Sequence, residues 1–216
     1  IESPKGYVLS EEEIAVTIGK VDEVVEIELV NYFIKGNIAL TKVDEDYPDN
    51  KLSGAVFEVY SDINGDGKLD KDDTLLGEMK ELDGGVYQMS ELRYGKYLVK
   101  ETKAPTGFVL DENVYAVSIE ENGKTYTVEN KADVGFINAA QKGSLKIVKT
   151  SSDGKVEGFS FRVTGVDYDQ TFKTDKNGEI VIEGLRIGDY TVSEVSDKAS
   201  AGYILPADKQ ATVKVD

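Results

Sequence analysis

The chain has 216 residues, which is enough for one large domain or for two domains of about 100 residues each. It contains no Cys, His or Trp, so Cys-based catalysis, Cys/His zinc sites and Ser-His-Asp triads are excluded, and any covalent cross-link must be something other than a disulfide. The formal net charge of −16 disfavours nucleic acid and anionic membranes as partners and favours cation binding. Its apolar runs are far shorter than a membrane span, so we expect no membrane insertion in this segment.

Strand patterns follow one another along the chain, and helical periodicity is weak throughout. The segments that alternate apolar and polar residues, and that are rich in Val, Ile, Tyr and Phe, are 36–44, 54–62, 95–103, 113–130 and 143–151. Turns rich in Gly, Asp and Asn separate them, at 83–85, 121–124, 151–155 and 175–179. Short strands at this spacing predict an all-β chain of β-sandwich type.

An internal repeat of roughly 100 residues divides the chain. The block "GNIALTK" (36–42) returns as "GSLKIVK" (143–149), and "ELRYGKYLVKE" (91–101) returns as "GLRIGDYTVSE" (184–194). We interpret the chain, which opens in mid-pattern, as an excerpt with three parts. These are the C-terminal part of a preceding domain (1–34), a complete domain (35–140) and a domain that lacks its last strand (141–216).

Three motifs of the complete domain carry a family resemblance: "LTKVD" (40–44), "LSGAVF" (52–57) and "ETKAPTGF" (101–108). Together they resemble the collagen-adhesin B-type repeat, also called the SpaA-like prealbumin-fold domain, of Gram-positive pilins and surface stalks. The last motif matches the E-box of that family at every fixed position. The third domain is a weaker match, because Glu194 lacks the following Ala-Pro. The resemblance implies tandem prealbumin-like (Ig-like) β-sandwich domains in a linear array.

The resemblance also implies an intramolecular isopeptide bond, in which a Lys of the first strand is joined to an Asn of the last strand and the E-box Glu assists. In the complete domain these residues are Lys42, Glu101 and Asn138, with Asn130 as an alternative acceptor. Asn138 is preferred because its distance to the next Gly equals that of Asn31, the acceptor assigned to the preceding domain. The residues implied for the third domain are Lys149 and Glu194.

The alternation of the strands puts both charged groups on apolar faces. Lys42 follows Ile38 and Leu40 at period two, as Glu101 follows Tyr97 and Val99. Burial lowers the pKa of a lysine and raises that of a glutamate, so a neutral amine can attack the amide while a protonated acid assists. The strand pattern alone also fits an ordinary surface ion pair. Isopeptide formation would be a single-turnover event, so we do not expect an enzyme.

The segment "DINGDGKLDKDD" (62–73) matches the twelve-residue calcium loop. Its expected ligands are Asp62, Asn64, Asp66, the carbonyl of Lys68, Asp70 and Asp73, with Gly67 at the sharp turn. Asp73 replaces the usual closing Glu and has a shorter reach. The alternative is a plain acidic turn. The pattern predicts a calcium loop inserted between two strands, not an EF-hand with flanking helices.

These features predict a structural stalk or pilus-like fibre module, extracellular and anchored to the cell wall by a part outside this segment. Its expected partners are neighbouring domains of the same or adjacent chains, with a host or matrix ligand at the distal tip as a further candidate. Two alternatives stay open. A ligand-binding adhesin domain would need an exposed aromatic cluster or long loops. A calcium-dependent, dockerin-like interaction module would need a second loop copy and helices.

Overall fold

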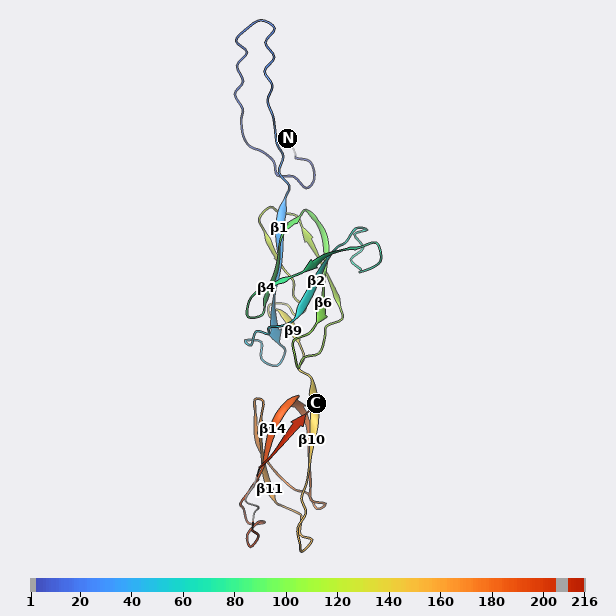
Figure 1. Cartoon of the computed structure of the whole chain (residues 1–216), viewed down its shortest axis with the longest axis vertical. Coiled ribbons are helices and arrows are strands. Elements are labelled where there is room, and N and C mark those ends of the chain that lie inside the picture. The colour runs from blue at the N-terminus through green and yellow to red at the C-terminus, as the bar shows by residue number, and fades with distance from the viewer. Residues whose placement is uncertain (1–2, 205–209, 216) are drawn as a thin grey trace. The chain divides into compact units, whose positions relative to one another are not determined.

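The computed structural model describes residues 3–204 and 210–215, and in this part of the chain it contains fifteen strands and no helix. No helix that could cross a membrane is therefore present among these residues. The chain divides into two compact units, Ile1–Ala139 and Ala140–Asp216 (Figure 1). The all-β prediction is confirmed. The assignment of residues 1–34 to a preceding domain stays a prediction.

The first sheet of unit 1 is built around its first strand, β1 (Lys35–Asp44). On one side β1 pairs antiparallel with β5 (Val86–Arg93), which in turn pairs with β4 (Lys80–Asp83). On the other side β1 pairs in parallel with two short strands, β8 (Thr125–Thr127) near its start and β9 (Phe136–Asn138) near its end. The last strand of the unit therefore lies directly beside the first.

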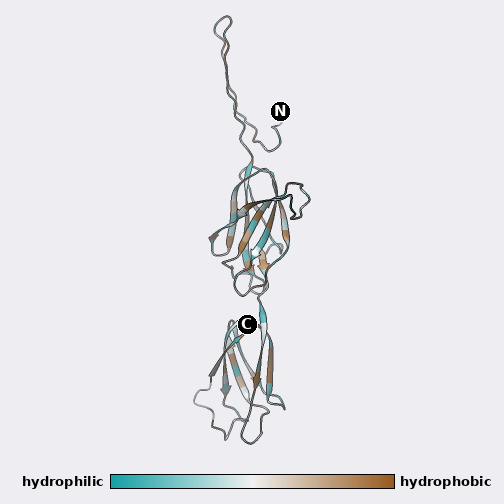
Figure 2. Ribbon diagram, turned by 45° about the vertical axis from the view of Figure 1, so that its right-hand side comes forward, coloured by the Kyte–Doolittle hydropathy of each residue, from teal (hydrophilic) through white to brown (hydrophobic). Residues whose placement is uncertain are grey.

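The second sheet of unit 1 is antiparallel and has the order β3–β2–β6–β7. Its strands are β3 (Thr74–Glu78), β2 (Val56–Ser61), β6 (Gly95–Lys103) and β7 (Val114–Ile119). Hydrophobic and hydrophilic residues alternate along the strands (Figure 2), which gives each sheet one face suited to a core. The core contains residues of both sheets, among them Ile38, Leu40, Phe57, Val59, Tyr87, Val99, Ile119 and Phe136.

Residues 3–34 belong to unit 1 but contribute no strand to either sheet. They form one isolated antiparallel bridge, between Tyr7 and Phe33, whose rings lie 4.8 Å apart. The guanidinium of Arg93 lies 4.0 Å from the centroid of the Phe33 ring. Beyond this contact most apolar side chains of the segment are exposed, including Ile18, Val21, Val24 and Leu29.

Unit 2 repeats the pairing scheme of unit 1. β10 (Lys142–Val148) pairs antiparallel with β13 (Glu179–Arg186), as β1 pairs with β5. The second sheet has the order β12–β11–β14–β15, with the strands Tyr168–Lys173, Ser160–Gly165, Gly188–Val195 and Gln210–Val215. Its core contains Leu145, Val163, Ile180, Ile182, Leu185, Tyr190 and Val192. Within the described residues no strand pairs with β10 in the way that β8 and β9 pair with β1.

A glycine turn fixes the backbone of the key lysine in each unit. The N–H of Lys42 donates to the carbonyl of Gly85 at 2.7 Å, and the N–H of Lys149 donates to that of Gly178 at 2.8 Å. Gly85 has a φ of 85°, and a Cβ at this position would lie 2.8 Å from the backbone nitrogen of Leu52. The turn therefore requires glycine both for its conformation and for the close approach of the chain.

We expect Gly85→Ala to lower the free energy of unfolding by about 3 kcal/mol, because it adds a backbone clash to the strain of a left-handed alanine. Gly123 is the matched control, since its φ is 76° but a Cβ there would meet nothing within 4 Å. Gly123→Ala should cost only about 1 kcal/mol, from strain alone. Urea denaturation measures both values. Equal losses for the two variants would contradict the close approach at Gly85.

Candidate functional site

Three polar side chains meet between the two sheets of unit 1. Lys42 comes from β1, Glu101 from β6 of the opposite sheet, and Asn138 from β9. The parallel register of β1 and β9 sets Lys42 opposite Phe136 and Asp44 opposite Asn138. Lys42 and Glu101 are fully buried, and Asn138 is 3% exposed. The period-two alternation of the strands thus directs both charged side chains inward.

Glu101 is the centre of the hydrogen-bonding pattern. Its two carboxyl oxygens accept bonds from Nδ2 of Asn138, at 2.9 and 3.0 Å, and its Oε2 also accepts the backbone N–H of Asp111 at 2.8 Å. The Nζ of Lys42 lies 4.0 Å from Oε1 of Glu101 and donates to the carbonyl of Phe136 at 3.0 Å. The Oδ1 of Asn138 is buried and has no hydrogen-bond partner among the described residues.

Aromatic rings enclose this group. The Phe136 ring lies 5.1 Å from Nζ of Lys42 and packs edge-on against both Phe57 and Tyr115, with ring centroids 5.0 and 5.1 Å apart. Such rings exclude water and give the site a low effective dielectric, in which an isolated charge is costly. The face of the Phe136 ring offsets part of that cost for a positive Lys42.

Burial shifts the two titrating groups in opposite directions. Desolvation lowers the pKa of Lys42 from 10.5 to about 8, although the facing carboxylates of Glu101, Asp111 and Asp44 act to raise it. Desolvation also raises the pKa of Glu101, and the hydrogen bonds from Asp111 and Asn138 together with the charge of Lys42 oppose this shift. Both shifts favour the uncharged forms, a neutral amine beside a protonated carboxyl group.

This arrangement has the components of an acyl transfer. A buried amine can act as the nucleophile, the carboxamide of Asn138 as the electrophile, and Glu101 as the proton carrier. Both oxygens of Glu101 lie at hydrogen-bond distance from Nδ2, which is the atom that would leave as ammonia.

The alternative acceptor, Asn130, occupies a different position. Its Nδ2 donates to Oδ2 of Asp111 at 2.8 Å and to the carbonyl of Ile137 at 2.9 Å, and its Oδ1 accepts the N–H of Ile137 at 2.6 Å. The structure therefore brings Asn138 to Glu101. Asn130 bonds instead to the backbone of Ile137, the residue before Asn138 in β9. Sequence reasoning did not identify Asp111 as part of this network.

Unit 2 contains a related pair. The Nζ of Lys149, which directly follows β10, lies 3.1 Å from Oε2 of Glu194 on β14, with side chains that are 17% and 9% exposed. Lys149 also lies over the ring of Phe159, 4.7 Å from its centroid. The Oε1 of Glu194 is buried and has no partner in the part of the chain that the structure describes. Asn31 is exposed in residues 3–34, where it lines a hollow with Leu9 and Tyr32.

The acidic loop 62–73 forms a compact turn between β2 and β3. Asp62 is buried, and its carboxyl oxygens accept the N–H groups of Gly65 and Gly67 at 2.7 and 3.1 Å. Both glycines have positive φ, of 72° and 76°. At the closing end Asp73 accepts the N–H groups of Ile63 and Asp70, at 3.2 and 2.9 Å.

The donor set of this loop suits a hard cation, because the side chains of Asp62, Asn64, Asp66, Asp70 and Asp73 and the Lys68 carbonyl are all oxygen donors. The side chains are arranged differently from a bound site. Among the described residues no group of three or more Asp, Glu, Cys or His side chains has metal-site geometry. The oxygens bond instead to loop N–H groups and, in the case of Asp70, to Nδ2 of Asn64 at 3.1 Å.

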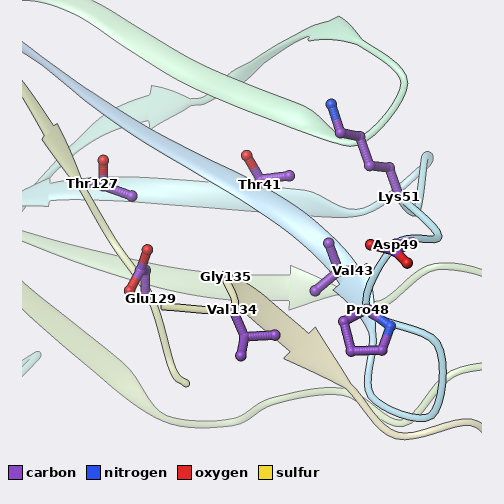
Figure 3. A pocket seen from close by; sticks show the side chains of 9 residues that line it. All are labelled: Thr41, Val43, Pro48, Asp49, Lys51, Thr127, Glu129, Val134 and Gly135. Carbon is purple, nitrogen blue, oxygen red and sulfur yellow. The ribbon is translucent and has the colours of Figure 1, made fainter. Parts of the chain in front are cut away.

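A surface hollow beside β1 was not anticipated from the sequence (Figure 3). It lies where residues 128–135 leave β1 between β8 and β9, and Gly135 approaches β1 so closely that a Cβ would lie 2.8 Å from the Thr41 carbonyl. The hollow mixes the cationic Lys51 with the anionic Asp49 and Glu129. This mixed lining indicates no particular ligand.

Comparison with solved structures gives a strong overall match to the Bacillus anthracis TIE protein, with 28% identity and a TM-score of 0.75. The alignment covers 100% of the present chain but only 38% of that protein, so the chain spans well under half the length of this relative. A streptococcal ancillary pilin is 19% identical over 91% of this chain and 64% of that one, with a TM-score of 0.38.

The shaft pilin SpaA of Lactobacillus rhamnosus GG is 16% identical over 84% of this chain and 94% of that one, with a TM-score of 0.38. These two superpositions are too loose to support a structural argument. No curated protein matches the chain in sequence.

A family model described as the SpaA prealbumin-like fold domain matches residues 36–133 and 143–216. The two matches fall one in each compact unit, as the internal repeat predicts, and together they span most of the chain. The resemblance carried by the E-box is thereby confirmed, and the chain belongs to the SpaA prealbumin-like fold domain family.

Proposed function

We propose that the chain is a stalk or pilus-like fibre module of a Gram-positive cell-surface protein, stabilised by intramolecular Lys–Asn isopeptide bonds and by a calcium loop. The observation that carries this proposal is that Lys42, Glu101 and Asn138 lie together, buried from water, between the sheets of unit 1. Family membership supports an extracellular location with attachment to the cell wall through another part of the protein.

The reaction is an exchange of one carbon–nitrogen bond for another. The neutral Nζ of Lys42 attacks Cγ of Asn138, and Glu101 gives its proton to Nδ2 as the bond from Cγ to Nδ2 breaks. Ammonia leaves, and the proton released by the attacking amine returns to Glu101. Nothing is oxidised or reduced. The product amide does not turn over, so the chain is not an enzyme in the ordinary sense.

The fold supplies most of the assistance by holding the groups together. The Nζ of Lys42 is held by the Phe136 carbonyl at 3.0 Å, and the carboxamide is held by both oxygens of Glu101. Well-oriented groups in a protein interior can gain about 7–11 kcal/mol in this way relative to free reactants.

The mechanical consequence follows from the position of the bond. The strands of unit 1 begin with β1 and end with β9, so a bond between Lys42 and Asn138 would let a pulling force bypass all the strands between them. In the unfolded chain the same bond would close a loop of about 100 residues. By analogy with a disulfide it would stabilise the unit by on the order of 4–5 kcal/mol.

In unit 2, Lys149 and Glu194 would act as the corresponding amine and acid. Their proximity, at 3.1 Å, and the unpartnered Oε1 of Glu194 within the described residues support this role. The carboxamide would have to come from a strand paired with β10 on the edge that β9 occupies on β1.

The calcium loop would stiffen the acidic insertion between β2 and β3. Calcium would be held by Asp62, Asn64, Asp66, the Lys68 carbonyl, Asp70 and Asp73, and it would neutralise their mutual repulsion. The Nζ of Lys96 on β6 already ties this loop to the second sheet by donating to the Gly65 carbonyl at 2.8 Å.

The two alternatives receive less support. A dockerin-like module would need helices beside the loop, whereas residues 3–204 and 210–215 contain none. A ligand-binding adhesin domain would need a receptive surface, and the mixed hollow beside β1 indicates no specific ligand.

Intact-mass measurement tests the bond directly. We expect the mass of the wild-type chain to be lower than the sequence mass by one ammonia molecule for unit 1. Lys42→Ala and Glu101→Gln should each restore the full mass, because they remove the nucleophile and the proton carrier. Lys35→Ala is the matched control on β1, and it should keep the ammonia loss because Lys35 is exposed. A full sequence mass for the wild-type chain would refute the proposal for unit 1.

The rate of linkage should depend on pH as a bell-shaped curve. The reaction needs Lys42 neutral and Glu101 protonated, so the rate falls about tenfold per pH unit below the raised pKa of Glu101 and above the pKa of Lys42, about 8. Between the two pKa values the rate should stay level. As the pH rises there, the fraction of neutral Lys42 increases by the same factor by which the fraction of protonated Glu101 falls. Refolding from urea with samples quenched for mass spectrometry, from about pH 5 to about pH 10, measures the curve. A rate that still rises above pH 9 or so would argue against a protonated Glu101.

Calcium binding should be measurable by isothermal titration calorimetry and by thermal unfolding. We expect calcium to raise the stability by about 2.7 kcal/mol at a concentration 100 times the dissociation constant. Asp66→Ala should abolish both signals, because it removes a ligand at position five of the loop. Asp72→Ala is the control, since it removes the same charge from the same loop without removing an expected ligand. A similar loss in both variants would indicate general charge attraction and no specific site.

A further inference from the structure

Asn130 makes hydrogen bonds to the backbone of β9 that a neighbouring strand would otherwise make. This strand is only three residues long and pairs with β1 on one side. The carboxamide of Asn130 meets both backbone groups of Ile137, donating to its carbonyl at 2.9 Å and accepting its N–H at 2.6 Å. Ile137 directly precedes Asn138, so the position of Asn130 affects where the Asn138 side chain lies.

Asp111 in turn holds Asn130. Its Oδ2 accepts the second Nδ2 proton of Asn130 at 2.8 Å and the hydroxyl of Tyr115 at 2.6 Å. Its Oδ1 accepts the backbone and side-chain N–H groups of Asn113 at 2.9 and 2.7 Å. Burial acts to raise the pKa of the Asp111 carboxyl, but these hydrogen bonds outweigh burial and lower it, so Asp111 stays ionised and a strong acceptor.

Asp111 also contacts the other half of the site. Its backbone N–H donates to Oε2 of Glu101 at 2.8 Å, the same oxygen that accepts Nδ2 of Asn138 at 3.0 Å. One residue therefore fixes Glu101 through its backbone and Asn138 through Asn130 and Ile137. These contacts form a closed ring that runs from Asp111 through Asn130, Ile137, Asn138 and Glu101 back to Asp111. The ring restricts the relative motion of the Glu101 carboxyl group and the Asn138 carboxamide more than either contact could alone.

We propose that Asp111 and Asn130 form a clamp that holds the carboxamide of Asn138 on Glu101. Both are positioning residues, because neither touches Lys42 Nζ or the carboxamide directly. What the held carboxamide is used for rests on the proposed isopeptide function, but the holding itself does not. A misplacement of about 1 Å is enough to slow a positioned reaction by roughly a hundredfold, which is why such a clamp matters.

Asn130→Ala is the cleaner of the two possible substitutions. Asp111→Asn would also remove a negative charge that acts on Lys42 and Glu101, which mixes positioning with electrostatics. Asn177→Ala is the matched control, because Asn177 is an exposed turn asparagine of unit 2 whose side chain contacts Asp175.

The first experiment does not depend on linkage. In a Lys42→Ala chain the Asn138 carboxamide is retained, and NMR follows exchange of its Nδ2 protons with solvent. Adding Asn130→Ala should speed that exchange roughly tenfold or more, while amides in the β1–β5 ladder keep their protection. Adding Asn177→Ala should change neither. Unaltered exchange of the Asn138 protons would overturn the clamp.

The second experiment follows linkage during refolding by intact mass. Asn130→Ala should slow linkage at least about tenfold under conditions where the Lys42→Ala/Asn130→Ala chain is fully folded by circular dichroism. A purely structural role would leave the rate in the folded protein unchanged, and that result would overturn the clamp while the proposed function stands. If even the wild-type chain does not link, the proposed function fails and the proton-exchange result alone decides on the clamp.

A milder variant keeps the test decisive if Asn130→Ala does not fold. Tyr115→Phe removes one hydrogen bond to Asp111 but retains the ring that packs against Phe136. We expect a smaller increase in proton exchange and a smaller loss of linkage rate, in the same direction. No change in either measurement with Tyr115→Phe would overturn the clamp in that case.

Discussion

The burial of Lys42 against Glu101 is the constraint on which the rest of unit 1 depends. Removing two ionisable groups from water costs several kcal/mol per ion unless they are paired well or neutral. Here the ammonium and the carboxyl are 4.0 Å apart, so direct pairing is poor. Burial shifts the pKa of both groups in the direction that favours their neutral forms. A sandwich selected for equilibrium stability alone would do better with apolar residues at both positions. Retaining them makes sense under the proposed reaction, because Lys42 would end as part of an uncharged amide that carries no desolvation cost of an ammonium, and Glu101 would be regenerated as the buried acid.

The last strand shows why that bond would matter. β9 has three residues and one strand neighbour, and the chain reaches it through residues 128–135, which leave β1 after β8. It therefore gains less from strand pairing than β1 or β5, which pair over longer stretches. Asn130 compensates for the missing neighbour on one side of the strand. A bond from Asn138 to Lys42 would add a covalent link to β1, the strand with which β9 already pairs.

The sequence was sufficient to predict the two strands that carry Lys42 and Glu101 and the inward faces of both residues, because a period-two pattern determines facing once the strand is correctly located. The sequence also favoured Asn138 over Asn130, because Asn138 and Asn31 have the same spacing to the next Gly. The structure brings Asn138 to Glu101. The roles of Asp111 and Asn130 could not be read in this way. They depend on how the connection after β6 returns to Glu101 and on the departure of residues 128–135 from β1, and neither leaves a periodic signal. The same holds for the loop 62–73, where the spacing specifies donors but not the direction in which each carboxylate turns.

The two units differ in what surrounds the lysine and glutamate side chains. In unit 2 the lysine contacts its glutamate directly, at 3.1 Å, and both side chains are partly exposed. In unit 1, where β9 is in place, the carboxamide occupies both oxygens of Glu101, the lysine lies farther away at 4.0 Å, and neither charged side chain is exposed. In unit 1 the strand β9 therefore has two effects on this pair. It brings the Asn138 carboxamide to both oxygens of Glu101, and its Phe136 ring covers the buried Lys42. Under the proposed isopeptide function, the strand that carries the carboxamide would therefore also contribute to the burial that lowers the pKa of the Lys42 amine.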